Sequence, residues 1–136
     1  MVEKTELQEK VLAYRILEAR LSGLMEQRKT LIDKIAEIQL TQASIDEIKT
    51  GARMLVPLGA EAHIFGEVVD DSKIIVEVGA GIALEKTIQE GKELLGKRME
   101  EMKNVLVQVE NNIAEVSMNL EKLGPEIQEL VKTLSR

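Results

Sequence analysis

The stretch that decides the fold is LGKRMEEMKNVLVQVENNIAEVSMNLEKLGPEIQELVKTL, residues 95–134. Apolar residues recur in it at alternating steps of three and four, and no position of this series is polar. A phase kept over so many turns predicts a coiled-coil helix, because a surface helix on a globular protein rarely holds it so long. The twelve positions of this seam are Leu95, Met99, Met102, Leu106, Val109, Ile113, Val116, Leu120, Leu123, Ile127, Leu130 and Leu134.

A second heptad pattern, free of proline, predicts another long helix over residues 5–50. Thr5 and Gln8 have the spacing of a capping box at its start, and Gly51 fits a left-handed residue that closes its end. Arg28 interrupts the seam, and we expect its guanidinium to reach solvent while its stem covers the seam. The expected seam positions are Leu7, Tyr14, Leu17, Leu21, Leu24, Arg28, Leu31, Ile35, Ile38, Gln42 and Ile45.

The C-terminal helix is expected over residues 87–135, because Thr87 and Glu90 form a second capping-box signature. Pro125 lies inside it and should kink or loosen it locally, since proline lacks the N–H and its ring clashes with the preceding turn. Two helices of similar length joined by a short middle segment predict one antiparallel pair. In the expected register Leu31 faces Leu106, and both chain ends lie at one tip of the coil.

The middle segment, residues 52–86, is rich in short β-branched runs separated by Gly and Asp, which indicates strands and turns. We expect two hairpins here. Two small hairpins are marginal in water and their edges need partners, so the segment predicts oligomerisation, most simply with the same region of other subunits. The four expected strands are Met54–Leu58, His63–Phe65, Glu67–Val69 and Ile74–Val78.

Composition excludes several classes of function. The formal net charge is −6, with 24 acidic against 18 basic residues, which opposes a nucleic-acid binder that neutralises phosphates. Tyr14 and Phe65 are the only aromatic residues, too few for base stacking. The chain has no Cys, which excludes disulfides and is compatible with a reducing cytoplasm. No apolar run approaches the ~20 residues that span a bilayer. We therefore expect a soluble, cytoplasmic protein that binds neither nucleic acid nor membrane.

No catalytic constellation can be assembled from these residues. His63 is the only histidine, so we interpret it as a surface residue of a strand and expect no enzyme activity. Asp70 and Asp71 could be imagined as metal ligands beside Glu67, but turn chemistry explains the aspartates. Gly79–Gly81 lacks the surroundings of a dinucleotide loop and is interpreted as a tight turn between strands. We expect no metal and no cofactor.

Two stretches carry a resemblance to a known family. Leu55-Val56-Pro57-Leu58-Gly59-Ala60, and Val76-Glu77-Val78-Gly79-Ala80-Gly81 followed by Ala83-Leu84-Glu85-Lys86-Thr87, resemble the archaeal prefoldin alpha subunit. So does the helix–two hairpins–helix layout, whereas beta-class subunits of that family have one hairpin. The resemblance implies an α+β fold in one domain, residues 1–136: a long antiparallel two-helix coiled coil whose hairpins pair into an oligomeric β-barrel.

The resemblance also implies a function. Two alpha and four beta subunits would form a hexamer that captures non-native client proteins between its coiled-coil tips without ATP and passes them to a group II chaperonin. The alternative is a self-assembling structural coiled-coil or filament protein built through the hairpins.

Client binding needs exposed apolar side chains on a flexible support, and we expect them at the tip, where the last turns should fray beyond Gly124. Met118 also lies off the seam near the tip. The expected client-binding residues are Val2, Leu7, Val11, Leu12, Ile16, Ile127, Leu130, Val131 and Leu134. The expected assembly residues in the hairpins are Leu55, Val56, Leu58, Ile64, Phe65, Val68, Ile74, Val76 and Val78.

Overall fold

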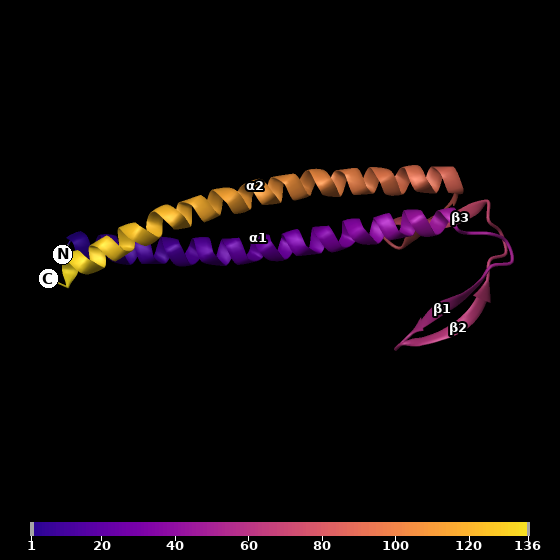
Figure 1. Cartoon of the computed structure of the whole chain (residues 1–136), viewed down its shortest axis with the longest axis horizontal. Coiled ribbons are helices and arrows are strands. Elements are labelled where there is room, and N and C mark those ends of the chain that lie inside the picture. The colour runs from indigo at the N-terminus through magenta and orange to yellow at the C-terminus, as the bar shows by residue number, and fades with distance from the viewer. Residues whose placement is uncertain (1, 136) are drawn as a thin grey trace. The chain divides into compact units, whose positions relative to one another are not determined.

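The computed structural model describes residues 2–135, which fall into two compact units. The arm unit consists of residues 2–34 and 102–135, and the hairpin unit of residues 35–101. Two long antiparallel helices pass through both units (Figure 1). Helix α1 spans Val2–Asp46 and helix α2 spans Ile88–Leu134, and four strands lie between them.

Two of the expected helix ends differ from those in the structure. Helix α1 already includes Thr5, so the expected cap at Thr5 is wrong. It ends at Asp46, and Gly51, although left-handed with φ of 88°, belongs to the connection to the first strand. Pro125 lies inside α2, as expected, and the helix continues past it. The expected start of α2 is confirmed, because the Thr87 hydroxyl accepts a hydrogen bond from the backbone N–H of Glu90 at 3.1 Å.

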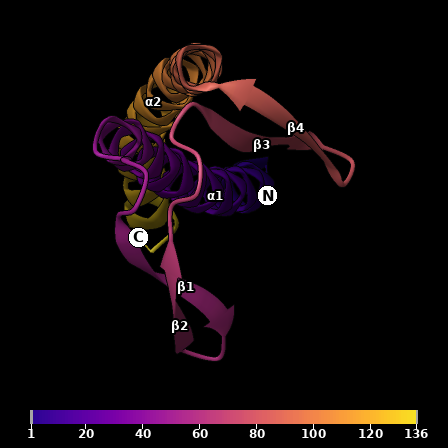
Figure 2. The ribbon, with the colours of Figure 1, turned by 90° about the vertical axis from the view of Figure 1, so that its right-hand side faces the viewer.

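The four strands form two separate antiparallel hairpins (Figure 2). Hairpin 1 pairs β1 (Arg53–Gly59) with β2 (Ala62–Glu67), and hairpin 2 pairs β3 (Lys73–Gly79) with β4 (Ile82–Thr87). Strand β4 ends at Thr87 and α2 begins at the next residue, whereas residues 47–52 separate α1 from β1.

The expected number of strands is confirmed, but one expected strand is wrong. Glu67–Val69 is not a separate strand, since Glu67 ends β2 and Val68 and Val69 follow it in the connection. The fourth strand is Ile82–Thr87, whose residues Ala, Leu, Glu and Lys favour a helix by intrinsic propensity. Pairing with β3 overrides that propensity.

The two hairpins repeat one design at a spacing of 20 residues. The register is irregular between Pro57 and Gly59 in hairpin 1, and at the equivalent place between Glu77 and Gly79 in hairpin 2. Both glycines are left-handed, with φ of 106° and 105°. Each hairpin turns on two residues of positive φ, Ala60-Glu61 and Ala80-Gly81, which is the pattern of a type I′ turn. The interpretation of Gly79–Gly81 as a strand-to-strand turn is therefore confirmed.

The expected seam is the core of the coiled coil. Val116 is 1% exposed, and every seam position of α2 is buried or half-buried except Leu134, which is exposed. In α1 all expected seam positions are buried or half-buried except Arg28. The Arg28 side chain is 44% exposed and its Nε lies 3.8 Å from a carboxylate oxygen of Glu110, so the expectation that it reaches solvent is confirmed.

Ion pairs within each unit confirm the expected antiparallel register. Arg28 faces Glu110 in the arm unit, and Asp46 pairs with Lys92 in the hairpin unit. Each pair lies within one residue of the register that sets Leu31 opposite Leu106. The expected register of the two helices is therefore confirmed to within one residue.

Hairpin 2 packs on the first turns of α2, and hairpin 1 does not have an equivalent support. Val76 is 7% exposed, and a Cβ added to the buried Gly91 of α2 would overlap the side chain of Ile74. Hairpin 1 contains no buried residue: both of its strands are exposed except at Gly66, which is half-buried. The two hairpins therefore have the same register and turn, but α2 covers one face of hairpin 2 while hairpin 1 has no buried residue.

Candidate functional site

The tip of the arm unit carries apolar side chains outside the seam. Val2, Leu12, Ile16 and Val131 are exposed, as expected for client-binding residues. Met118 is exposed as well. Leu7, Ile127 and Leu130 are half-buried in the seam, and Val11, expected to face outward, is half-buried too. Leu134, expected in the seam, is exposed, because α2 ends there.

A groove of about 300 Å³ lies between the two helices of the arm unit near this tip. Its apolar lining comes from Val11, Tyr14 and Ile127, and its polar lining from Arg15, Glu18 and Gln128. Gly124 also lines the groove, and a Cβ added there would lie 3.8 Å from the Tyr14 ring, which is an ordinary van der Waals contact. Tyr14, the only tyrosine of the chain, therefore lies against α2 at Gly124.

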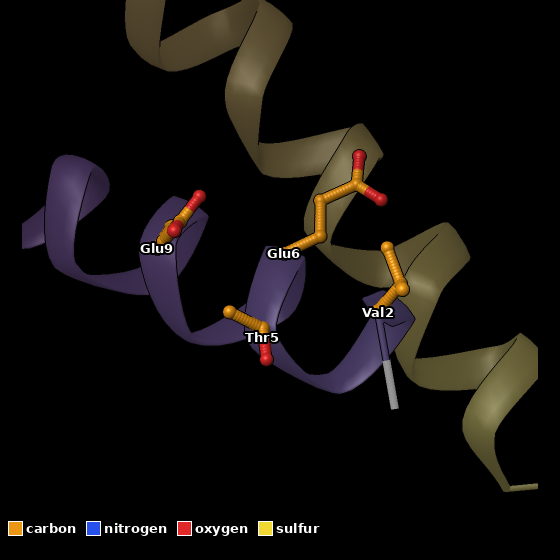
Figure 3. Close-up of a pocket in the computed structure, with 4 residues that line it drawn as sticks. All are labelled: Val2, Thr5, Glu6 and Glu9. Atoms are coloured by element: carbon orange, nitrogen blue, oxygen red, sulfur yellow. The ribbon is translucent and has the colours of Figure 1, made fainter.

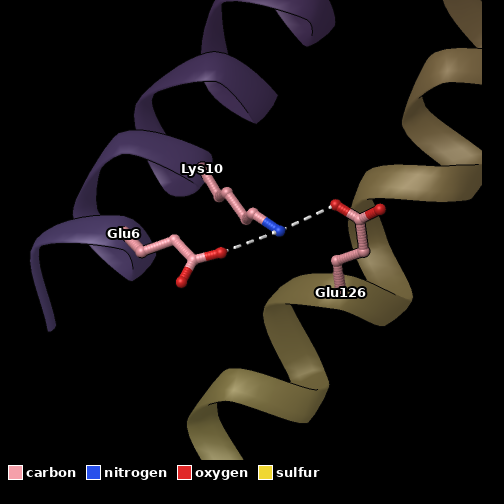
Figure 4. Close-up of polar contacts among 3 residues, drawn as sticks. All are labelled: Glu6, Lys10 and Glu126. Carbon is pink, nitrogen blue, oxygen red and sulfur yellow. Dashed lines mark hydrogen bonds and ion pairs between the residues drawn. The ribbon is translucent and has the colours of Figure 1, made fainter. Parts of the chain in front are cut away.

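The helices are tied together at the tip by one lysine between two carboxylates (Figure 4). The Nζ of Lys10 lies 3.0 Å from an oxygen of Glu126 on α2 and 3.4 Å from an oxygen of Glu6 on α1. The hydrogen bond to Glu126 raises the pKa of Lys10 above its ordinary value of 10.5. Lys10 therefore stays charged at neutral pH and joins α1 to the residue that follows Pro125.

A larger hollow of about 520 Å³ is lined, among the described residues, by side chains of α1. Figure 3 shows its four lining side chains, all from this helix: Val2, Thr5, Glu6 and Glu9. All four are exposed, so the hollow is a surface depression rather than an enclosed site. It lacks the buried, convergent polar groups that a small-molecule site would need.

The hairpins present a second apolar surface. Leu55, Val56, Leu58, Ile64 and Phe65 of hairpin 1 and Val78 of hairpin 2 are exposed, as an assembly surface requires. Phe65 is the most open of them, with 85% of its surface exposed. Val68 is half-buried.

Two expected assembly residues do not lie on a free surface. Val76 is buried and Ile74 is half-buried, because this face of hairpin 2 packs on α2 at Gly91. Three exposed residues of hairpin 2 were missed instead: Ile75, Ile82 and Leu84. The alternation of side chains along β3 could have indicated Ile75, since it points away from the face of Ile74 and Val76.

The polar residues of the turns have structural partners. Asp70 accepts hydrogen bonds at one oxygen from the backbone N–H and the hydroxyl of Ser72, at 2.8 and 2.5 Å. These bonds, that of the hydroxyl most of all, lower the pKa of Asp70 below its ordinary value. Asp71 accepts a bond from the backbone N–H of Thr50 at 3.2 Å. The interpretation of the two aspartates as turn residues is confirmed, and His63 lies exposed on β2.

Two kinds of feature are absent from the part of the chain that the structure describes. Between residues 2 and 135 no three or more His, Cys, Asp or Glu side chains are grouped so that they could hold a metal ion. No helix in the same range is long and apolar enough to cross a membrane.

A family model described as Prefoldin subunit matches residues 17–133, which covers most of both helices and both hairpins. The chain belongs to the prefoldin family. Prefoldins are chaperones that assemble into oligomeric complexes, and they are not an enzyme family. The double hairpin and the relatives below agree with the alpha class within this family.

Curated archaeal prefoldins are similar along most of the chain. Prefoldin subunit alpha of Pyrococcus horikoshii is 28% identical over 129 residues, covering 92% of this chain and 87% of the relative. Prefoldin subunit alpha 1 of Thermococcus kodakarensis is 32% identical over 105 residues, covering 74% and 72%. A solved structure of filamentous prefoldin from Methanocaldococcus jannaschii superposes with a TM-score of 0.72 at 26% identity, covering 84% of this chain and 97% of the other.

Proposed function

We propose that the chain is a subunit of an ATP-independent holdase, which captures unfolded proteins at the tip of the arm unit. The observation that carries the proposal is the group of exposed apolar side chains at this tip: Leu12, Ile16 and Val131. An unfolded chain offers apolar segments without a fixed shape, and such surface is what can bind them. No substrate chemistry is needed, in keeping with a chaperone family.

Each arm should bind its client weakly. The exposed side chains at the tip are aliphatic, and the aromatic residue there, Tyr14, is half-buried. Interfaces without exposed aromatic anchors contain fewer strong hot spots. Several arms acting on one client would supply the missing affinity through effective concentration. The proposal therefore depends on an oligomer.

We further propose that the oligomer is a hexamer of two such alpha subunits and four beta-type subunits, closed by a barrel of their hairpins, and that it hands clients to a group II chaperonin in the cytoplasm. The exposed apolar residues of hairpin 1 support an assembly role for the hairpins, because no buried side chain occurs in this hairpin and its apolar surface is left uncovered. The absence of cysteine is compatible with a reducing cytoplasm.

Aggregation suppression by the complex with a beta-type subunit tests client capture at the tip. The triple variant Leu12→Ser, Ile16→Ser and Val131→Ser should lose most of the suppression of a denatured substrate. The matched control is Leu40→Ser with Val107→Ser, which removes equally exposed apolar side chains away from the tip. Unchanged suppression by the triple variant, or an equal loss in the control, would contradict the proposal.

Fraying of the last turns is a separate part of this proposal. Deleting residues 126–136 removes Ile127, Leu130, Val131 and Leu134 together, and also the Glu126 partner of Lys10. We expect the assembled complex to lose aggregation suppression while its mass still corresponds to a hexamer. If suppression persisted, the C-terminal turns would have no part in client capture.

A filament-forming role is the second candidate, supported by the likeness to the filamentous prefoldin. Exposed hairpins can pair with copies of the same chain as well as with a beta-type subunit. Native mass spectrometry with and without a beta-type subunit separates the two. A closed hexamer in the mixture supports the holdase, whereas open-ended particles of this chain alone support the filament.

A further inference from the structure

The seam of the arm unit changes character in its last layers, next to the chain ends. The register that sets Leu31 opposite Leu106 continues to the tip, where the Lys10–Glu126 ion pair agrees with it to within one residue. In the last three layers the α2 residue is always apolar, but the α1 residue is charged in two of them. The end of α2 therefore receives less apolar cover from α1 than the rest of the seam. These layers are Lys10 with Ile127, Leu7 with Leu130, and Glu3 with Leu134.

A weakened turn of α2 comes just before these layers. Pro125 has no N–H, so the carbonyl of Glu121 lacks the intrahelical hydrogen bond that residue 125 would otherwise donate. Gly124, next to it, has a low intrinsic preference for a helix. The C-terminal turns, residues 126–134, are thus joined to the rest of α2 by a turn that lacks a hydrogen bond. Their position depends on their contacts with α1.

Lys10 contacts the C-terminal turns in two ways. Its Nζ lies 3.0 Å from a carboxylate oxygen of Glu126, the first residue after Pro125 (Figure 4). Its side chain is only 27% exposed, so the aliphatic stem packs between the helices instead of extending into solvent. In this register the stem lies over Ile127, which is half-buried. One side chain therefore ties the C-terminal turns to α1 and also covers an apolar residue on them.

The ammonium of Lys10 has a second partner, which does not join the two helices. Glu6 lies one turn earlier on α1, and its carboxylate oxygen is 3.4 Å from the same Nζ. If Glu126 moves away, Lys10 keeps an oppositely charged neighbour on its own helix. The cross-helix pair can therefore break without leaving the lysine unpaired, which gives the ammonium two alternative positions.

We propose that Lys10 is a latch on the C-terminal turns of α2. Paired with Glu126, it holds these turns on α1 and keeps Ile127 covered. When this pair breaks and the ammonium turns to Glu6, Ile127 and Leu130 become available to an unfolded client. Lys10 is thus a positioning residue, which regulates client capture without binding the client. The inference rests on the proposed capture of clients at the tip.

The latch should respond to ionic strength. The side chains of Lys10 and Glu126 are both partly exposed, and salt screens the attraction between such charges. The apolar contact of Leu7 with Leu130 is not weakened in this way. Salt should therefore release the ion pair first and shift the C-terminal turns toward the open position.

Amide hydrogen exchange of the full chain tests the latch directly. Glu126→Gln removes the charge at nearly constant size, and the amides of residues 127–134 should exchange about two- to five-fold faster, as expected for the loss of a partly exposed ion pair. Glu110→Gln is the matched control, because it breaks the cross-helix pair with Arg28 in the middle of α2. It should leave the exchange of these amides unchanged. So should Glu6→Gln, which keeps the pair with Glu126.

Charge reversal and salt distinguish a latch from a merely structural effect. Lys10→Glu alone should speed exchange in the C-terminal turns, because it sets two carboxylates against each other. Lys10→Glu combined with Glu126→Lys reverses the pair and should restore slow exchange. The ratio of exchange rates between Glu126→Gln and the unmodified chain should fall toward one as salt rises to about 1 M, where the screening length is ~3 Å.

Aggregation suppression by the complex with a beta-type subunit tests the consequence for clients. The complex with Glu126→Gln should reach half-maximal suppression at a lower concentration than the unmodified complex, whereas that with Glu110→Gln should not. Adding Ile127→Ser to Glu126→Gln should abolish this gain, because the apolar side chain that the open latch uncovers is then missing.

Three results would overturn the proposal. Equal exchange of the C-terminal turns in Glu126→Gln and Glu110→Gln would mean that the pair does not hold them. Failure of the reversed pair to slow exchange would mean that the charge of Lys10 has no part in it. Faster exchange in Glu126→Gln without a gain in suppression would mean that opening does not regulate capture. The holdase proposal is judged separately, by the triple variant that keeps Lys10 and Glu126 and replaces exposed tip residues.

Discussion

Replacing Arg28 with leucine measures how much a polar residue at a seam position lowers the stability of the arm unit. Arg28 lies on the α1 seam between Leu24 and Leu31, close to Val109 of the facing seam, which is among the most buried residues of the chain. Its guanidinium reaches out to Glu110 instead of packing in the seam. A leucine would extend the apolar seam and lose this ion pair.

The two effects can be compared in magnitude. Full burial of a leucine side chain stabilises by ~1.5–3 kcal/mol, and since the neighbouring seam leucines are only half-buried, about 1 kcal/mol is expected here. The lost pair joins side chains that are 44% and 50% exposed, and such pairs contribute ~0.2–1 kcal/mol. The net gain is roughly 0.5 kcal/mol, or about 2 °C in melting temperature for a chain of this size.

Thermal unfolding followed by circular dichroism checks this prediction, with Arg28→Gln as the control. Glutamine removes the ion pair without adding apolar surface, so its melting temperature should fall slightly below that of the unmodified chain. The leucine variant should melt above both. A leucine variant that melts at or below the arginine form, or a glutamine variant that gains as much as leucine, would refute the reasoning.

Three further predictions concern the hairpin unit. Glu61→Gly should stabilise hairpin 1 by ~1 kcal/mol, because Glu61 has a φ of 64° that costs an L-residue about that much, and its β1 and β2 amides should exchange more slowly. Gly91→Ala should loosen hairpin 2, seen as faster amide exchange in β3, because overlap with Ile74 costs ~1–3 kcal/mol against a gain of ~1 kcal/mol in helix propensity. Asp70→Asn should destabilise the chain at neutral pH, since the Ser72 hydroxyl lowers the pKa of Asp70 and so stabilises the charged carboxylate in the folded state. The difference in unfolding free energy from the unmodified chain is fully present above pH 3.8 and should vanish as the pH falls through the lowered pKa, which unfolding curves at several pH values will show.

The coiled coil was predictable because the spacing of its apolar residues determines which side chains pack between the two helices. Residues repeated at steps of three and four must share one face of a helix, so Val109 and Val116 could be placed in the core without knowledge of the fold. The register followed from the positions of the two helices alone. The cap at Thr87 was predictable, whereas that at Thr5 was not, since capping spacing also occurs inside a long helix.

The hairpin region was predictable only in outline. Strand β4 consists of residues that favour a helix, and its pairing with β3 decides its conformation. Alternation along β3 divides its residues into two faces but does not indicate which face α2 covers. That choice depends on Gly91, whose missing side chain admits Ile74, and no local pattern marks this glycine as a contact. The candidate tip residues could be chosen because they lie near the chain ends. The half-burial of Val11 could not be predicted, because it depends on how closely the two helices approach each other.

The direct junction of β4 with α2 has a mechanical consequence. Thr87 ends the strand and caps the helix at once, so tension applied along α2 reaches the ladder of hairpin 2 with no slack between them. Tension along α1 reaches β1 only through residues 47–52, which are held by hydrogen bonds such as that from the Ala52 N–H to the Lys49 carbonyl. The two helices therefore transmit a pull differently: α2 loads hairpin 2 directly, whereas a pull on α1 must first break the hydrogen bonds of residues 47–52 before it loads hairpin 1.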